Sequence, residues 1–235
     1  MLSAFAETGA AIHVCDIDNS ALAAFQKRFP SCKATNTDVA DEKQVASLFK
    51  TQRSAFDGLD VLVNCAGISG PTGGVDKIEE EDWKRTIDVN LGGQYRCLHH
   101  AVPMLLESKT PNIICISSVA GRLGYPNRTP YAATKWAIVG IMKALAIELG
   151  PQDIRVNALL PGVVEGPRMD GVIRARAELA GVEKAVMREE YLKKISLRRM
   201  VSADDVALMC LFLCSQAGRN ITGQAISVDG NVEYL

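Results

Sequence analysis

The sequence lacks the features by which membrane proteins and nucleic-acid-binding proteins are usually identified. Its 26 Lys and Arg residues nearly balance its 27 Asp and Glu residues, so no basic excess would attract nucleic acid or an anionic membrane. No uninterrupted apolar run approaches the roughly 20 residues that cross a bilayer. The first residues, MLSAFAE, have neither a basic leader nor an apolar signal core. We therefore expect a cytoplasmic protein that binds neither nucleic acid nor membranes.

Cysteine is present, but not in the arrangement of a disulfide framework or a metal site. The seven cysteines are odd in number, and most lie in apolar segments rather than in pairs with metal-ligand spacing. Cys210 and Cys214 are four residues apart and could share a helix face, but no histidine accompanies them. We predict reduced cysteines in the core and no metal.

Short β-branched segments alternate with segments of helical spacing along the chain. The strand-like segments are 11–15, 59–63, 112–116 and 154–159. The segments with helical spacing are 20–29, 42–56, 80–106 and 131–149. Because parallel strands need crossover connections that cover both faces of a sheet, this order predicts an α/β fold with a Rossmann-type, doubly wound, mostly parallel sheet. No linker or repeat interrupts the chain, so residues 1–235 are predicted to form one domain.

One insertion departs from this alternation. Residues 163–200 contain two charged helical patches, which we expect to lie over the carboxyl ends of the strands, where ligands bind in such sheets. Their arginines could attract an anionic substrate, but glutamates largely balance them. Mixed charge at helical spacing more often marks a solvated face, so we interpret the insertion as an amphipathic cover.

The start of the chain lacks the glycine-rich turn that opens a dinucleotide-binding fold. In such folds the acidic residue that holds the adenosine ribose follows that turn by about 20 residues. The candidate acid here, Asp16, comes too early, and residues 1–8 resemble the last turns of a helix that ends at Gly9. We therefore expect the first strand, the turn and the start of the first helix to lie before residue 1. A misassigned start and a true truncation are both compatible with this pattern.

Tyr131 and Lys135 are the strongest chemical signal in the sequence. They are four residues apart in a helical segment and therefore lie on one face, one turn apart. In isolation, such a pair is more often an exposed contact between an aromatic ring and a cation. Here Ser118 ends a strand, and the carboxyl ends of strands collect functional groups in this type of sheet. We expect Ser118, Tyr131 and Lys135 to converge.

Five ordered motifs make the chain similar to the short-chain dehydrogenase/reductase family, and the resemblance covers essentially all of its length. The motifs are Asn64-Cys65-Ala66-Gly67, Asn90, Ser118, Tyr131 with Lys135, and Pro161-Gly162. The resemblance implies an oxidoreductase that transfers a hydride between NAD(H) and a small alcohol or carbonyl substrate. It also implies a homotetramer or homodimer built on segments 80–106, 131–149 and 228–235.

The resemblance implies a role for each candidate catalytic residue. Tyr131 would exchange the proton at the substrate oxygen, and Ser118 would hold the substrate carbonyl. Lys135 would favour the Tyr131 phenolate through its charge and would bind the nicotinamide ribose. Asn90 would anchor a water that links Lys135 to solvent, or it is simply a polar residue in a helix interior that bonds to backbone.

The resemblance further implies NAD as the cofactor. Asp16 would accept both adenosine ribose hydroxyl groups, and its charge would repel the extra phosphate of NADP. The alternative is that Asp16 only begins a turn. The other implied cofactor contacts, besides Tyr131 and Lys135, are Ile17, Asp38, Val39, Asn64, Ala66, Gly67, Pro161, Gly162 and Val164. Gly166 stands where the family often has a threonine near the carboxamide of the nicotinamide.

A second hypothesis is a protein without catalytic activity. If the glycine turn is absent, cofactor binding is weakened, and a dehydrogenase that does not hold its cofactor cannot deliver a hydride. The chain would then be an impaired remnant that oligomerises or binds a ligand. The intact set of Asn90, Ser118, Tyr131 and Lys135 favours the enzyme.

Overall fold

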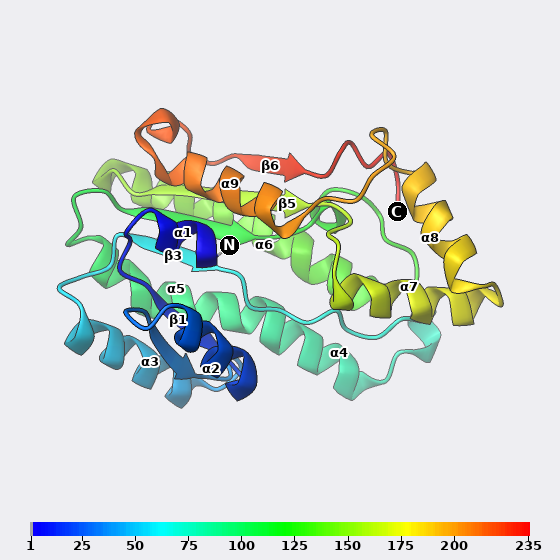
Figure 1. Ribbon diagram of the computed structural model, residues 1–235, viewed down its shortest axis with the longest axis horizontal. Coiled ribbons are helices and arrows are strands. Elements are labelled where there is room, and N and C mark those ends of the chain that lie inside the picture. The colour runs from blue at the N-terminus through cyan, green and yellow to red at the C-terminus, as the bar shows by residue number, and fades with distance from the viewer. Residues whose placement is uncertain (1) are drawn as a thin grey trace.

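The computed structural model describes residues 2–235 and confirms the α/β fold with parallel strand pairing (Figure 1). The strands are β1 (His13–Asp16), β2 (Lys33–Asn36), β3 (Val61–Asn64), β4 (Asn112–Ile116), β5 (Arg155–Pro161) and β6 (Ala225–Val228). The α-helices are α1 (Leu2–Glu7), α2 (Asn19–Arg28), α3 (Glu42–Ala55), α4 (Glu80–Ile87), α5 (Gly93–Leu105), α6 (Thr129–Leu149), α7 (Pro167–Ala180), α8 (Lys184–Lys193) and α9 (Ala203–Cys214).

The parallel strands form two parts. One part has the strand order β3-β4-β5-β6, and the other consists of β1 and β2. No strand within residues 2–235 hydrogen-bonds to both β1 and β3. All five residues of β4 are buried, which agrees with the apolar run Ile113–Ile116 and the position of the strand between two others.

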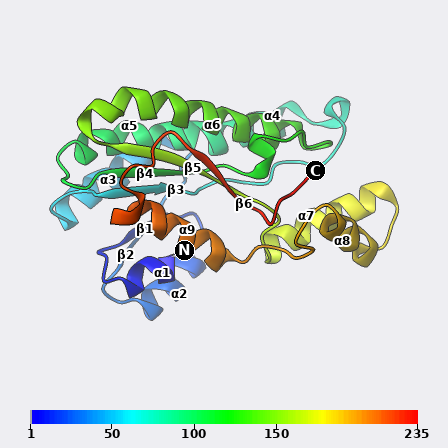
Figure 2. The ribbon, with the colours of Figure 1, turned by 90° about the horizontal axis from the view of Figure 1, so that it is seen from above.

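Helices cover both faces of the four-stranded part, as a doubly wound fold requires (Figure 2). On one face, α5 and α6 pack against the strands, with Met104 and Met142 in the same buried cluster as Ile113. On the other face, α9 packs against them through residues such as Leu213. The carboxyl ends of the strands are therefore left for the loops that carry the candidate site.

The four predicted strands are present with ends shifted by at most two residues, but two strands were not predicted. Lys33–Asn36 and Ala225–Val228 are only four residues long, and the first contains no large apolar residue. Their position beside a neighbouring strand, rather than an apolar pattern, makes them strands. The helix end at Gly9 agrees with the prediction, because α1 ends at Glu7 and Gly9 has a φ of +80°.

The predicted helix 80–106 is interrupted by a π-helical segment at Asp88–Gly92. Such a segment contains one extra residue per turn and often occurs at functional sites. Gly93, directly after it, approaches Val39 so closely that a Cβ there would lie 2.6 Å from Val39 Cγ2. The interruption therefore lets the helix pack against the segment after β2 while it turns Asn90 inward.

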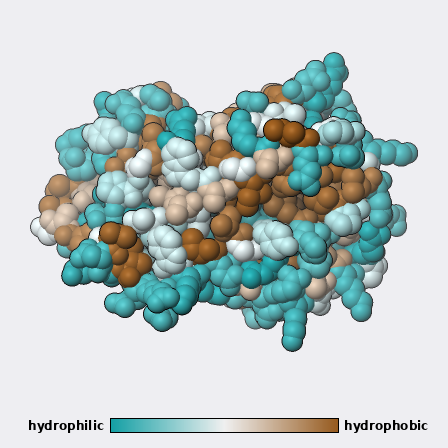
Figure 3. Space-filling view, turned by 180° about the vertical axis from the view of Figure 1, so that it is seen from behind, coloured by the Kyte–Doolittle hydropathy of each residue, from teal (hydrophilic) through white to brown (hydrophobic). Residues whose placement is uncertain are grey.

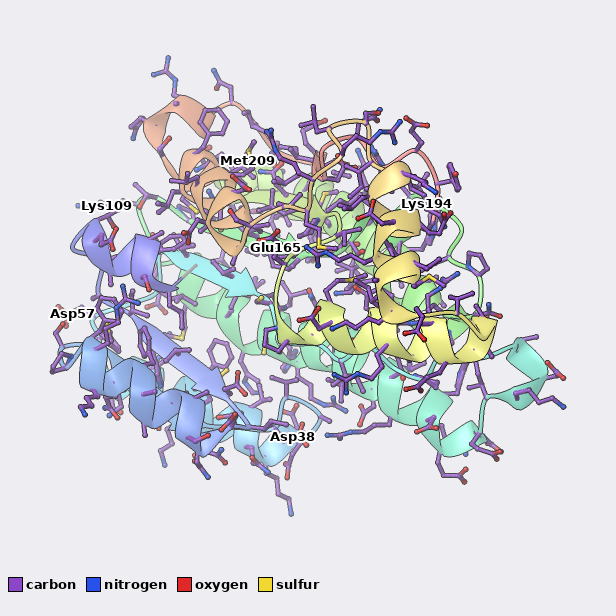
Figure 4. The ribbon with its side chains drawn as sticks, turned by 45° about the vertical axis from the view of Figure 1, so that its right-hand side comes forward. Asp38, Asp57, Lys109, Glu165, Lys194 and Met209 are labelled. Carbon is purple, nitrogen blue, oxygen red and sulfur yellow. The ribbon has the colours of Figure 1, made fainter. Side chains whose placement is uncertain are left out.

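The insertion forms a lid made of α7 and α8, with a buried cluster of its own that includes Ile173, Tyr191 and Ile195. Figure 4 shows Glu165 on the segment that leads from β5 to the lid, and Lys194 at the end of α8. Val164 pairs with Val201 at the base of this lid.

Within residues 2–235, no helix has the length and apolar character to span a bilayer. The same residues contain no group of three His, Cys, Asp or Glu side chains arranged to hold a metal.

Candidate active site

Ser118 lies just beyond the carboxyl end of β4. Its backbone is extended, with a φ of −172°, and its Oγ accepts a hydrogen bond from the backbone N–H of Ala120 at 3.2 Å. Ser117 faces away, and its Oγ donates to the carbonyl oxygen of Lys135 at 2.7 Å. A Cβ on Gly121 would lie 2.6 Å from the same carbonyl oxygen, so glycine is required where this loop meets α6. These contacts hold Ser118 beside the first turns of α6.

Tyr131 and Lys135 lie one turn apart in α6, as the spacing predicts. The Lys135 Nζ is 5.6 Å from the centroid of the Tyr131 ring. Lys135 is buried, and its Nζ donates to the carbonyl oxygen of Ile116, at the end of β4, at 3.0 Å. An ammonium has three donors, and this contact uses one of them. Strand β4 and helix α6 thus bring all three predicted residues to one place.

The charges around Tyr131 favour its ionised form. Burial by itself raises the pKa of the phenol, but the charges of Lys135 and Arg168, the hydroxyl of Ser118 and the charge of Arg128 together lower it below its ordinary value. Burial also lowers the pKa of Lys135, and the charge of Arg168 acts in the same direction, whereas Tyr131 opposes them. A phenol with a lowered pKa is suited to exchange a proton near neutral pH.

Asn90 holds the loop that follows β3. Its Oδ1 accepts from the backbone N–H of Ile68 at 2.7 Å, and its Nδ2 donates to the carbonyl oxygen of Ile68 at 3.0 Å and to Thr134 Oγ1 at 3.2 Å. The backbone that it bonds is therefore not that of its own helix. Gly67 lies between these groups, because a Cβ there would be 3.1 Å from Asn90 Oδ1 and 3.8 Å from Lys135 Nζ.

The start of the same loop is fixed by a pair of amides. Asn64 Nδ2 donates to the carbonyl oxygen of Gln94, and Gln94 Nε2 donates to that of Asn64, each at 3.0 Å. Cys65 and Ala66 follow and are exposed. All seven cysteines are free, as predicted, but the prediction of a core position is wrong for Cys65. Its place at the strand end, where the chain leaves the sheet, explains the difference.

Asp16 is the last residue of β1 and is exposed. Its Oδ1 accepts from the backbone N–H of Asp18 at 3.0 Å. The cap of α2 is Asp18 instead, whose side chain accepts from the backbone N–H groups of Ser20 and Ala21. Asp16 therefore keeps carboxylate capacity for a ligand, and Ile17 beside it is also exposed.

Asp38 has a partner that the sequence did not predict. Its Oδ1 accepts from the backbone N–H of Ala40 at 2.9 Å, and its Oδ2 lies 3.0 Å from Arg85 Nη2 on α4. Burial raises the pKa of this carboxyl, but the hydrogen bond from Ala40 and the guanidinium of Arg85 lower it overall. Figure 4 shows Asp38 on the side of the β1–β2 part that faces α4. Val39 is buried in the core.

Pro161 ends β5, and Gly162 follows at a point of close backbone approach. A Cβ on Gly162 would lie 2.7 Å from the Cα of Asp229, so only glycine fits there without a shift. Val164 is half-buried and is held through its bridge to Val201. Gly166 has a φ of +138°, a conformation that a threonine would adopt only with strain. The turn into α7 therefore differs from one that carries threonine.

The residues at this edge of the sheet fit a nicotinamide cofactor. The two unused donors of the buried Lys135 suit the hydroxyl groups of a ribose. The exposed carboxylate of Asp16 suits a second ribose at the other part of the sheet. The exposed loop at Cys65 and Ala66 lies after β3, the edge strand of the four-stranded part.

Two arginines beside Tyr131 were not among the predicted site residues. Arg128 directly precedes α6, is buried, and donates from Nη2 to the carbonyl oxygen of Ser69 at 2.6 Å. Arg168 is exposed on the first turn of α7 and donates from Nε to Ser69 Oγ at 3.1 Å. In the sequence, Arg168 is one of several charged residues of the insertion, and no motif distinguishes Arg128. Only the fold brings both to Ser69.

Among residues 2–235, the lid arginines form no ion pairs with the lid glutamates that balance their charge in the sequence. The ion pairs that involve α7 and α8 join Lys184 to Asp170 and Lys193 to Glu190. Arg168 turns inward to Ser69, and Arg176 donates to the carbonyl oxygen of Pro126 at 3.2 Å. The lid is therefore less uniformly solvated than its sequence indicates.

Comparison with known proteins gives matches along nearly the whole chain. A family model described as enoyl-(acyl carrier protein) reductase matches residues 2–232. A 3-oxoacyl-[acyl-carrier-protein] reductase of Staphylococcus aureus is 35% identical over 199 residues, which cover 85% of this chain and 76% of that protein.

Solved structures of similar proteins superpose closely on this one. The 3-ketoacyl-(acyl-carrier-protein) reductase of Brucella melitensis, complexed with NADH, is 32% identical with a TM-score of 0.86, over 97% of this chain and 90% of that one. A variant of actinorhodin polyketide ketoreductase with NADPH is 27% identical with a TM-score of 0.93, over the same shares. The similar structures thus include one with NADH and one with NADPH.

Proposed function

Because this chain belongs to the short-chain dehydrogenase/reductase family, we propose that it transfers a hydride between NAD(H) and a small alcohol or carbonyl substrate. The observation that carries the proposal is the placement of Tyr131 between the buried ammonium of Lys135 and the hydroxyl of Ser118. The bound nicotinamide supplies or accepts the hydride. The chain's own residues handle the proton and the position of the substrate.

Tyr131 exchanges the proton at the substrate oxygen. In reduction it donates from its hydroxyl to the oxygen as negative charge develops there, and in oxidation it removes the hydroxyl proton of the alcohol. Lys135 favours the phenolate through its charge and offers its two remaining N–H donors to the nicotinamide ribose. Ser118 holds the substrate oxygen and so stabilises the developing charge.

Asn90 acts on the position of the loop after β3 rather than on the substrate. Its two hydrogen bonds to Ile68 fix the backbone next to Gly67, which is close to Lys135. By family resemblance, this asparagine would also anchor a water that links Lys135 to solvent. Loss of the side chain is expected to displace Lys135 as well as that water.

We propose NAD rather than NADP as the preferred cofactor. Asp16 would accept the hydroxyl groups of the adenosine ribose, and its carboxylate would repel a phosphate in the same place. Ile17, Asp38, Val39, Asn64, Ala66 and Gly67 would line the adenosine side, and Pro161, Gly162 and Val164 the nicotinamide side. The similar structures with NADH and with NADPH show that relatives bind either cofactor, so we propose Asp16 as the feature that distinguishes the two here.

The pyrophosphate of the cofactor would cross the gap between β1 and β3, where we propose that a further strand and glycine turn belong. A titration of NADH into the 235-residue chain, followed by nicotinamide fluorescence, tests this beside a chain that carries such a strand and turn in front of residue 1. NADH binding by the longer chain alone would support the second hypothesis, that the 235-residue chain is an impaired remnant. Equal binding by both would contradict a need for the added strand.

We also propose a homotetramer or homodimer. The face formed by α4, α5 and α6 exposes Trp83, Tyr95, Trp136 and Ile147, and Figure 3 shows an apolar band across it. A shallow hollow of about 850 Å³ lies there between Trp83 and Tyr95, away from Tyr131. Light scattering of Ile147→Glu beside the native chain tests the assignment, since a charge on this face should lower the oligomeric mass.

The free thiols suit a reducing compartment such as the cytoplasm.

The proposed activity is tested by following NADH oxidation with a panel of small ketones and aldehydes. Reduction of any of them by the native chain, and its loss in Tyr131→Phe, is the expected result. Turnover that survives Tyr131→Phe would contradict the assigned chemistry.

A further inference from the structure

Positive charge collects around Tyr131, and its arginines have no carboxylate partners. Lys135, Arg168 and Arg128 all act on the phenol as nearby cations. Among residues 2–235, neither Arg128 nor Arg168 forms an ion pair with Asp or Glu. The site therefore has a net positive charge at the place where the substrate must bind.

Arg128 is the more unusual of the two arginines because it is almost fully buried. It is 2% exposed, and its Nε and Nη1 have no hydrogen-bond partner. The rings of Tyr125 and Tyr131 lie 5.3 and 5.2 Å from its guanidinium carbon, which offsets part of the cost of burial. A buried cation without an anionic partner is nevertheless unfavourable, and such groups often mark functional sites.

Arg168 adds an accessible guanidinium to the same place. It lies on the first turn of α7, where the positive end of the helix dipole opposes a cation and favours an anion. Its Nε contacts the hydroxyl of Ser69, while Arg128 contacts the carbonyl oxygen of that same residue. Two like charges thus converge on one residue from the lid and from the core, which is an arrangement that an anion between them would stabilise.

We propose that Arg168 and Arg128 hold a carboxylate of the substrate, so that the substrate is a small oxo or hydroxy acid rather than a neutral ketone or alcohol. The planar guanidinium of Arg168 offers paired donors that match a carboxylate, and Arg128 supplies the second positive charge from beneath. The inference rests on the proposed function and narrows it. Reduction still adds a hydride from the reduced nicotinamide to the carbonyl carbon and a proton from Tyr131 to the oxygen, and the carboxylate is unchanged.

The first experiment compares 2-oxo, 3-oxo and 4-oxo acids of three to six carbons with their methyl esters, which keep the ketone and remove the charge. We expect at least one acid to exceed its ester by about tenfold or more in kcat/KM. Arg168→Met should raise KM for the acid and not for the ester, and so remove that advantage, whereas kcat should fall alike for both because the Arg168 charge also lowers the pKa of Tyr131. Arg174→Met, an exposed arginine of the same helix without such contacts, is the matched control and should change neither.

The outcomes separate substrate binding from a merely structural role. If the two arginines only fasten the lid to Ser69, Arg168→Met lowers kcat/KM for acid and ester by the same factor, the acid keeps its advantage, and the proposal is overturned. Esters as good as acids in the native chain overturn it too, as does a preference for phosphate esters over carboxylates. Arg128→Lys keeps the buried charge, whereas Arg128→Met removes it. If both variants melt like the native chain, a larger loss of kcat/KM for acids in Arg128→Met than in Arg128→Lys supports the proposal.

A binding measurement keeps this inference separate from the activity itself. Butanoate, which has no ketone to reduce, is titrated calorimetrically into the native chain and into Arg168→Met in the presence of NADH. Binding that depends on Arg168 without any oxo acid reduced would support the anion site and contradict the proposed function. Reduction of neutral ketones without butanoate binding would contradict the anion site alone.

Discussion

The two parts of the sheet hold the candidate residues in different ways. In the four-stranded part every residue of β4 is buried, and this strand places both Ser118 and the carbonyl oxygen that Lys135 contacts. In the two-stranded part no residue of β1 or β2 is buried, and Asp16 is exposed. The groups proposed to react are thus fixed by the core, whereas those proposed to bind adenosine lie at an open edge. Changes in the two parts should therefore have different consequences.

The largest difference between the two parts is expected for Tyr131→Phe, which should change turnover far more than cofactor affinity. Loss of the phenol hydroxyl removes the proton donor, so turnover should fall by roughly 10²–10⁴-fold. The affinity for NADH, measured by fluorescence, should stay nearly the same because adenosine is bound elsewhere. A parallel loss of NADH affinity would show that the two parts do not act separately.

Lys135→Met should change the pH dependence of alcohol oxidation. The base must be deprotonated, so the oxidation rate rises with pH through the pKa of Tyr131, which the Lys135 charge helps to lower. Without that charge the midpoint should move to higher pH, and the rate at neutral pH should fall by about tenfold or more. An unchanged profile in a variant that melts like the native chain would refute the electrostatic role.

Asp16→Ser should change cofactor preference rather than turnover. Removal of the carboxylate relieves its repulsion of the NADP phosphate. The affinity for NADPH relative to that for NADH should therefore rise by about tenfold, or about 1.4 kcal/mol. Asp18→Ser is the matched control two residues away. Serine caps a helix about as well as aspartate, so this variant removes a nearby carboxylate and should change neither melting nor the preference. The same shift in both variants would indicate a general effect of charge.

Hydrogen exchange should show a smaller, several-fold difference between the two parts. Backbone amides of β4 pair with strands on both sides, whereas β1 pairs only with β2 among the strands of residues 2–235. Exchange in β1 should therefore be faster than in β4 without ligand, and NADH should slow it. Equal protection in the two strands would mean that the open edge is as stable as the core.

The sequence predicted the elements that have strong patterns and the residues that lie close along the chain. Tyr131 and Lys135 share a helix face by spacing alone, and the buried strand at 112–116 has four consecutive apolar residues after Asn112. The strand at Lys33–Asn36 was not predictable, because its pairing with β1 decides its conformation. The same holds for the π-helical turn at Asn90, which depends on contacts with the loop at Ile68.

The positions of the charged side chains in the site depend even more on tertiary structure. Composition suggests that lid arginines and glutamates neutralise one another, but the fold turns Arg168 inward to Ser69 and buries Arg128 behind it. The pairing of Asp38 with Arg85 likewise joins residues far apart in the chain. Such contacts between charges require the arrangement of the loops, which local patterns do not encode.

The most direct test of the central claim is the transfer of deuterium from NADH that carries deuterium at both C4 positions of the nicotinamide to a reduced substrate of the oxo-acid and ketone panel. Mass spectrometry of the product should show one deuterium on the carbinol carbon with the native chain, and Tyr131→Phe should form this product roughly 10²–10⁴-fold more slowly. Unlabelled product from the native chain, or labelled product at the same rate from Tyr131→Phe, would contradict hydride transfer at the Ser118, Tyr131 and Lys135 site.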